Sequence, residues 1–167
     1  PEIVLLKPHG LPDSYFAEFG WVPGGKTAVP TGDTVWTADT RTLQSGSPVT
    51  LTWDNGQGLT FKRTIAIDEN YMFTVTQRVE NTGADPVTLY PYGLISRGQT
   101  PEVTRFYILH EGPLGVFNGT LEEVDYDDLQ ETGVIEEAST GGWMGITDKY
   151  WLTALAPKQD AETKGRF

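Results

Sequence analysis

Apolar and polar residues alternate with a period of two through the middle of the chain, which is the pattern of half-buried β-strands. The alternating or apolar runs are residues 49–54, 59–67, 73–79 and 87–96. The first two are separated by Asn55-Gly56, a pair that readily adopts positive φ in hairpin turns. We therefore expect a four-stranded antiparallel meander from Val49 to Ser96, with each strand paired to the next.

A second apolar cluster occupies the last third of the chain, from Gly141 to Trp151. Two glycines open it, and it contains two of the five tryptophans. Residues 152–156 continue it as an apolar strand candidate. The stretch therefore predicts a hairpin that closes a core, with Asp148-Lys149 at its tip.

Composition favours β structure throughout the chain. There are 19 Gly and 11 Pro in 167 residues, and no long stretch repeats apolar residues with the helical period of about 3.6. We expect an all-β fold with little helix, organised as one domain over residues 1–167, which is long enough to be stable without crosslinks. The absence of cysteine excludes disulfides, thiolate metal sites and cysteine nucleophiles.

The net charge of the chain limits the kinds of molecule that it can bind. The formal net charge is −11, from 12 Lys and Arg against 23 Asp and Glu, and such a field repels the phosphates of nucleic acid and anionic lipid. Eight of the acids crowd into residues 122–137. Three interpretations of that segment remain open: a solvated acidic loop, a calcium site at Asp125, Asp127 and Asp128, or a docking surface for a basic partner.

The sequence contains no constellation for catalysis. Its two histidines, His9 and His110, lie about a hundred residues apart, and no Gly-x-Ser-x-Gly nucleophile turn occurs. No motif selects a pair of carboxylates for glycoside hydrolysis. We therefore assign no catalytic, cofactor-binding or metal-binding residue, and we predict that the chain is not an enzyme.

The aromatic residues admit two interpretations. Trp21, Trp36, Trp53 and Tyr92 either pack in a core or line a cleft that stacks on sugar rings. The second interpretation defines an alternative function, a carbohydrate-binding or carbohydrate-active β-sandwich. Arg63 lies on the apolar face of its predicted strand, where a charge needs compensation, so we expect it at the sheet rim or beside an acid.

Four stretches carry a family resemblance. They are Tyr15 to Trp21, Leu59 to Ile65, Tyr71 to Gly83 and, above all, Gly141 to Leu152 with its Gly-Gly-Trp and Tyr-Trp elements. On these residues, which span most of the chain in the right order, the sequence resembles the periplasmic domain of the YidC family of bacterial membrane-protein insertases.

The resemblance implies a twisted antiparallel β-sandwich, the supersandwich type similar to galactose mutarotase. In the family this domain lies on the periplasmic face of the inner membrane, between a first transmembrane helix and a five-helix core, so the parent protein is membrane-embedded. The resemblance also implies that the family domain extends beyond both ends of residues 1–167. It implies a non-catalytic role in the insertion and folding of inner-membrane proteins, because the paired histidines and glutamate base of mutarotase chemistry have no counterpart here.

Partners follow from the same resemblance. The family's periplasmic domain contacts the SecDF accessory subunits of the Sec translocon, so SecDF and nascent membrane proteins are the implied partners. We place this contact on the loop-rich segment beside the acidic run, with four side chains in contact: Arg97, Arg105, Tyr107 and Tyr126. A rigid spacer without any ligand is the remaining alternative.

Overall fold

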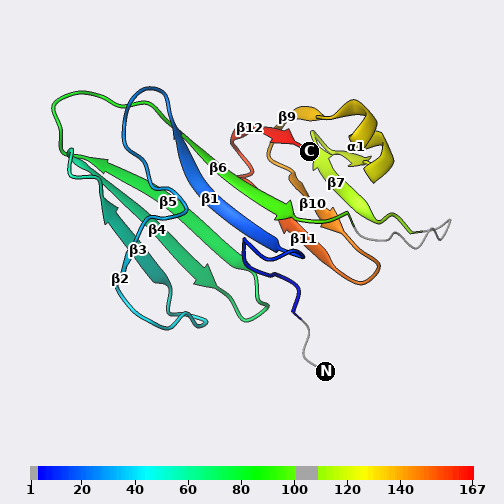
Figure 1. Cartoon of the computed structure of the whole chain (residues 1–167), viewed down its shortest axis with the longest axis horizontal. Coiled ribbons are helices and arrows are strands. Elements are labelled where there is room, and N and C mark those ends of the chain that lie inside the picture. Colours follow the sequence, from blue (N-terminus) through cyan, green and yellow to red (C-terminus); the bar gives the residue numbers. More distant parts are fainter. Residues whose placement is uncertain (1–3, 101–108) are drawn as a thin grey trace. The chain divides into compact units, whose positions relative to one another are not determined.

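The computed structural model describes residues 4–100 and 109–167, and these are nearly all β, with every assigned strand pair antiparallel. The elements are β1 (Tyr15–Pro23), β2 (Thr37–Ala38), β3 (Val49–Asp54), β4 (Leu59–Ile67), β5 (Phe73–Asn81), β6 (Leu89–Arg97), β7 (Gly112–Phe117), β8 (Thr120–Glu123), α1 (Tyr126–Thr132), β9 (Glu136–Thr140), β10 (Trp143–Thr147), β11 (Leu152–Leu155) and β12 (Glu162–Arg166) (Figure 1). The predicted all-β sandwich class is confirmed.

The chain divides into two compact units. Unit 1 comprises Pro1–Glu18 and Gly93–Phe167, and unit 2 comprises Phe19–Tyr92. The expectation of one domain over residues 1–167 stays a prediction.

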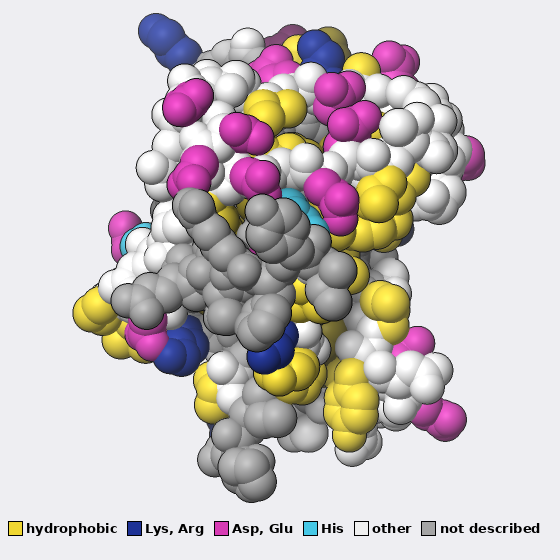
Figure 2. Space-filling view, turned by 90° about the vertical axis from the view of Figure 1, so that its right-hand side faces the viewer, with side chains coloured by type: hydrophobic (Ala, Val, Ile, Leu, Met, Phe, Trp, Pro, Cys, Tyr) yellow, Lys and Arg dark blue, Asp and Glu magenta, His cyan; other side chains and the backbone are white. Residues whose placement is uncertain are grey.

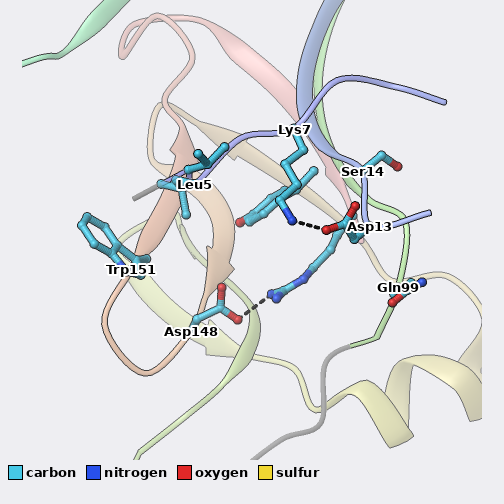
Figure 3. Close-up of a pocket in the computed structure, with 10 residues that line it drawn as sticks. Leu5, Lys7, Asp13, Ser14, Gln99, Asp148 and Trp151 are labelled. Carbon is cyan, nitrogen blue, oxygen red and sulfur yellow. Dashed lines mark hydrogen bonds and ion pairs between the residues drawn. The ribbon is translucent and has the colours of Figure 1, made fainter. Parts of the chain in front are cut away.

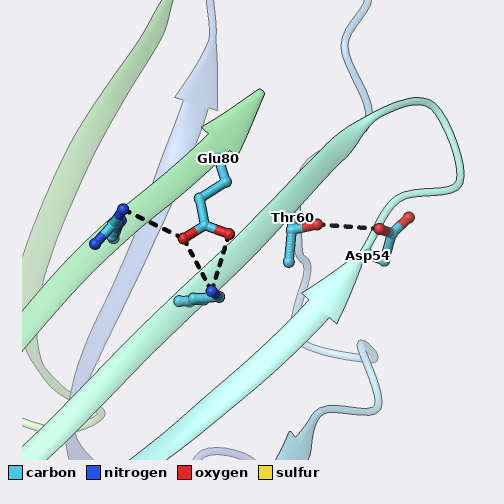
Figure 4. Close-up of polar contacts among 5 residues, drawn as sticks. Asp54, Thr60 and Glu80 are labelled. Atoms are coloured by element: carbon cyan, nitrogen blue, oxygen red, sulfur yellow. Dashed lines mark hydrogen bonds and ion pairs between the residues drawn. The ribbon is translucent and has the colours of Figure 1, made fainter. Parts of the chain in front are cut away.

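Unit 2 contains a four-stranded sheet in the order β2-β3-β4-β5. Because successive strand residues point to opposite faces, the register places Trp53, Phe61 and Val79 side by side on the inner face. The outer face is polar: Lys62 donates to both carboxylate oxygens of Glu80 at 2.9 Å, and Arg78 lies 3.3 Å from the same carboxylate (Figure 4). The alternation seen in the sequence is therefore the difference between the core face and the solvent face.

Phe61 is the centre of the unit 2 core. Its side chain is fully buried, and Leu59 beside it is 2% exposed. The Trp21 ring, from β1, meets the Phe61 ring edge to face at a centroid distance of 5.1 Å, and the Trp53 ring lies at 5.6 Å. Rings of this size bury large apolar areas, so this cluster supplies much of the stability of unit 2.

Two polar side chains of the inner face are compensated by the backbone of β1. Arg63 donates to the carbonyl of Phe19, and Gln77 donates to the carbonyl of Gly20 at 2.8 Å. The Arg63 guanidinium also lies over the Trp36 ring, at 4.9 Å from its centroid. Arg63 is in the middle of its strand, opposite Gln77, so the expected rim position is wrong. Polar groups withdrawn from water need partners, and the carbonyls of β1 provide one for each of the two side chains.

The predicted meander is correct for three strands and wrong for the fourth. β3, β4 and β5 pair in sequence order, but β6 pairs with β1, and the short strand β2 completes the sheet beside β3. Two features of the sequence explain the difference. The connection after β5 is long enough to leave the sheet, and Pro91 offers no N–H to a ladder. Leu89, the first residue of β6, instead packs against the core cluster that contains Phe61.

Unit 1 contains a sheet in the order β11-β10-β7-β8 and a pair of strands, β12 and β9. The predicted hairpin is confirmed as β10 and β11, with Gly145 opposite Ala154, and Asp148 N–H donates to the Trp151 carbonyl across the turn at 2.8 Å. Phe117 is 7% exposed and meets the Phe167 ring edge to face at 5.8 Å. This contact is the aromatic centre of the apolar layer between β7 and the end of the chain.

The structure contains a helix that the sequence pattern did not predict. Helix α1 lies within the acidic segment expected to be a loop, with Asp127 and Asp128 in its first turn, where carboxylates favour the positive end of the helix dipole. No helix of the described residues is long and apolar enough to cross a membrane.

The close packing around Gly142 predicts how much an added side chain there would destabilise the fold. Its φ is +81°, and an added Cβ would lie 2.0 Å from the Val116 carbonyl oxygen. Gly119 has nearly the same φ, +83°, with nothing within 4 Å of an added Cβ. We expect Gly119→Ala to lower the free energy of unfolding by about 1 kcal/mol from backbone strain alone. We expect Gly142→Ala to lower it by about 3 kcal/mol, because a backbone clash is added. Urea denaturation measures both, and equal losses would contradict the close approach.

Candidate functional site

A pocket of about 280 Å³ lies in unit 1. It is built from the N-terminal segment, the start of β1, the end of β6 and the β10–β11 turn (Figure 3). Its lining residues are Val4, Leu5, Lys7, Asp13, Ser14, Tyr15, Arg97, Gln99, Asp148 and Trp151. Segments distant in sequence therefore converge on one hollow.

The less exposed of the two ion pairs in the pocket joins Arg97 and Asp148. The Arg97 Nη1 and Asp148 Oδ1 atoms are 2.5 Å apart, and the side chains are only 22% and 24% exposed. The guanidinium also lies over the Tyr15 ring, 5.1 Å from its centroid. Burial acts to lower the pKa of Arg97, but the hydrogen bond and charge of Asp148 outweigh it and hold that pKa above its usual value. Arg97 is therefore a fixed cation that binds the β10–β11 turn to the end of β6.

Two phenols complete the surroundings of this cation. Tyr15 is the first residue of β1 and is 6% exposed, and Tyr126 is the first residue of α1. Burial raises the pKa of both phenols, so both are neutral at physiological pH. They give Arg97 an aromatic surrounding of low polarity, in which its pairing with Asp148 is strengthened.

A second ion pair faces the same hollow. Lys7 donates to Asp13, and Figure 3 shows this pair on one side of the pocket and the Asp148 carboxylate on the other. The Lys7 backbone forms a bridge with Tyr15, with N–H···O distances of 2.7 and 3.0 Å in the two directions. The hydrogen bond from Lys7 lowers the pKa of Asp13. The four charges in the pocket are therefore two opposite pairs.

The rim of the pocket is apolar and exposed. Val4 is 59% exposed and Trp151 is 44% exposed, and two neighbours of Trp151 in the chain, Tyr150 and Leu152, are 77% and 49% exposed. Four large apolar side chains in solvent have no stabilising role in an isolated domain. An apolar rim over paired charges suits the reception of a polypeptide segment, because side chains meet the rim and backbone polar groups meet the charges.

The structure places two of the four predicted contact residues near one another. Arg97 lines the pocket, and Tyr126 lies close enough for the Arg97 cation to affect the pKa of its phenol. Arg105 and Tyr107 lie outside the described residues. No short pattern in the sequence indicates Asp148 as the partner of Arg97, because the two residues are 51 positions apart. The partner-binding assignment stays a prediction.

The four predicted cleft aromatics lie in unit 2. Trp21 and Trp53 pack on Phe61, and Trp36 lies under the Arg63 guanidinium. The Tyr92 ring is partly buried and lies so close to the Cα atom of Gly20 that no side chain would fit there. Trp21 also lines an apolar groove of about 480 Å³ beside β5 and β6, but only 5% of it is exposed. Sugar binding by these rings stays a prediction, and their core contacts leave little ring face for it.

The acidic segment of unit 1 is solvated. All eight of its carboxylate residues are exposed, and Figure 2 shows acidic side chains gathered over the upper part of one face, at the level of α1. Among the described residues, no group of three or more His, Asp or Glu side chains is arranged to hold a metal ion. The calcium interpretation of Asp125, Asp127 and Asp128 therefore gains no geometric support.

Comparison with known proteins gives a consistent result. The family described as the YidC periplasmic domain matches residues 1–167. A relative from Methylorubrum extorquens (strain PA1) is 50% identical over 177 residues, covering all of this chain and 29% of the relative. Relatives from Bradyrhizobium diazoefficiens and Granulibacter bethesdensis are 48% and 49% identical, covering 100% and 95% of this chain and 27% and 29% of their own lengths. All three are named membrane protein insertase YidC, and the chain spans less than a third of each.

The Arg97 and Asp148 pair generates a prediction for a double-mutant cycle. We expect Arg97→Gln to lower the free energy of unfolding by about 2 kcal/mol, because Asp148 is left partly buried without its cation. The double variant Arg97→Gln with Asp148→Asn should lose at least about 1 kcal/mol less than the sum of the single losses.

The exposed pair Lys158 and Asp160 is the control for that cycle. Lys158→Gln should change the free energy of unfolding by less than about 0.5 kcal/mol. Urea denaturation of the four variants measures the coupling, and additive losses at Arg97 and Asp148 would show that the pair does not hold the pocket together.

Proposed function

The chain belongs to the YidC periplasmic domain family, and from that premise we propose that it is a non-catalytic domain that assists the insertion and folding of inner-membrane proteins. Its place is the periplasmic face of the inner membrane, as part of a longer, membrane-embedded protein. Its contribution is a docking surface, and the partners are the SecDF accessory subunits and nascent membrane proteins.

The observation that carries this proposal is the pocket with the exposed apolar rim. Val4 and Trp151 present apolar surface to solvent, while Arg97 and Asp148 neutralise each other beneath them. A preformed hollow whose charges are already paired, under an apolar rim, binds without first ordering its own side chains, which lowers the entropic cost of docking. The same pairing supports a non-catalytic role, because no charged side chain of the pocket is available as a poised base.

Arg97 acts in this proposal through the geometry of the rim. It is held by Asp148, whose backbone N–H closes the turn that presents Tyr150 and Trp151. A partner therefore meets the aromatic side chains of the turn first. The net charge of −11 adds a long-range preference for partners with basic segments.

Photocrosslinking in inner-membrane vesicles tests the proposal. A photoreactive amino acid at Tyr150 of the full-length protein should form adducts with SecDF subunits, and these adducts should be absent from vesicles that lack SecDF. Arg97→Glu should reduce their yield at least fivefold, because repulsion by Asp148 releases the turn. Leu121, which is 54% exposed in the same unit but outside the pocket, is the control position and should give few such adducts. An unchanged yield in Arg97→Glu would refute this placement of the contact.

A further inference from the structure

The turn between β4 and β5 in unit 2 exposes three consecutive large apolar side chains. Tyr71 is 80% exposed, Met72 is 67% exposed and Phe73 is 56% exposed. Side chains of this kind bury about 150–250 Å² when covered, so the three together leave roughly 300–500 Å² of surface in solvent. Apolar side chains exposed to this extent on three successive residues of a small domain are typical of a contact surface.

The turn is held rigid by one carboxylate. Asp68 Oδ1 accepts hydrogen bonds from the backbone N–H groups of Asn70, at 2.8 Å, and Met72, at 2.9 Å. The Asp68 N–H donates to the Met72 carbonyl at 3.1 Å, and the Tyr71 N–H donates to the Asp68 carbonyl at 3.3 Å. Four hydrogen bonds to one residue therefore order the backbone of the turn from which these apolar side chains project.

Both the backbone conformation of Tyr71 and the exposure of its ring cost free energy in an isolated domain. Its φ is +61°, in the left-handed region that glycine occupies without strain and that aromatic residues rarely adopt. Its ring is also almost fully in solvent, so no packing offsets the strain. Both costs are removed by glycine at this position, which indicates that the exposed ring has a role outside the fold.

The charge around this tip selects the kind of partner. Asp68 and Glu69 stand directly beside it, and neither residues 42–53 nor residues 64–77, which form the neighbouring strands and turns, contain a Lys or Arg. An acidic collar is repelled by anionic lipid headgroups and attracted to basic side chains. Exposed apolar side chains flanked by acidic residues are complementary to an apolar pocket flanked by basic residues.

We propose that residues 71–73 are an anchor that docks into an apolar socket with a basic rim on a partner protein. Tyr71 is the central side chain, since rigid aromatic residues carry much of the energy in such contacts. The anchor lies in unit 2 and uses no residue of the Arg97 pocket, so it is a second contact surface and stands independently of the first.

Photocrosslinking from the anchor in native membranes tests the proposal. The full-length protein carries p-benzoylphenylalanine at Tyr71, which keeps an aromatic ring at that backbone position. Val35, which is 87% exposed in the same unit, is the matched control position. We expect one discrete protein adduct from position 71, at least fivefold weaker from position 35, with its crosslinked peptide containing apolar residues next to Lys or Arg.

Charge reversal makes the test specific. Glu69 is exposed, and Glu69→Lys should reduce the adduct at least fivefold, while Glu69→Gln should reduce it less. Tyr71→Gly should keep or raise the melting temperature, which separates a contact role from a folding role. Adducts with lipid alone, with a second copy of the chain, at equal yield from position 35, or unaffected by Glu69→Lys would each overturn the proposal.

Discussion

The candidate site depends on the requirement that Arg97, at the end of β6, be paired where it is mostly withdrawn from water. Asp148 meets that requirement from the β10–β11 turn, and Tyr15 packs its ring on the same guanidinium. A partly buried charge without its partner is strongly destabilising, so this contact fixes the turn and the start of β1 at once. The exposed side chains Tyr150 and Trp151 are then presented in a defined arrangement.

In unit 2, polar side chains that are partly withdrawn from water are also paired, but their partners are backbone carbonyl groups. Its core is apolar around Phe61, yet Arg63 and Gln77 project from the same sheet face. Each donates a hydrogen bond to a carbonyl of β1, and the bonds that reduce the cost of burying these groups also hold β1 over the sheet. In both units, polar side chains among apolar ones decide which strand lies where. The apolar pattern alone decides only which face is buried.

The sequence predicts those elements that depend on neighbouring residues in the chain, such as an alternating strand or a tight turn. The β3–β4 hairpin follows from alternation and from a turn in which Gly56 and Gly58 take positive φ, and the β10–β11 hairpin follows from its apolar arms. The partner of β6 and the partner of Arg97 are contacts between distant segments, which one sequence does not encode in any short pattern. Trp21 is an example. The size of its ring predicts a large contact area, but the sequence does not show that the ring packs against Phe61 in the core.

We propose that the Arg97 pocket and the adjoining turn form a docking surface for SecDF. Amide hydrogen exchange on the full-length protein in lipid nanodiscs, with and without purified SecDF, tests it most directly. We expect SecDF to slow exchange in residues 148–152 and in the N-terminal segment around Lys7, and to leave exchange in strand β4 of unit 2, around Lys62, unchanged. Unchanged exchange in residues 148–152, or slower exchange confined to the acidic segment 122–137, would contradict it.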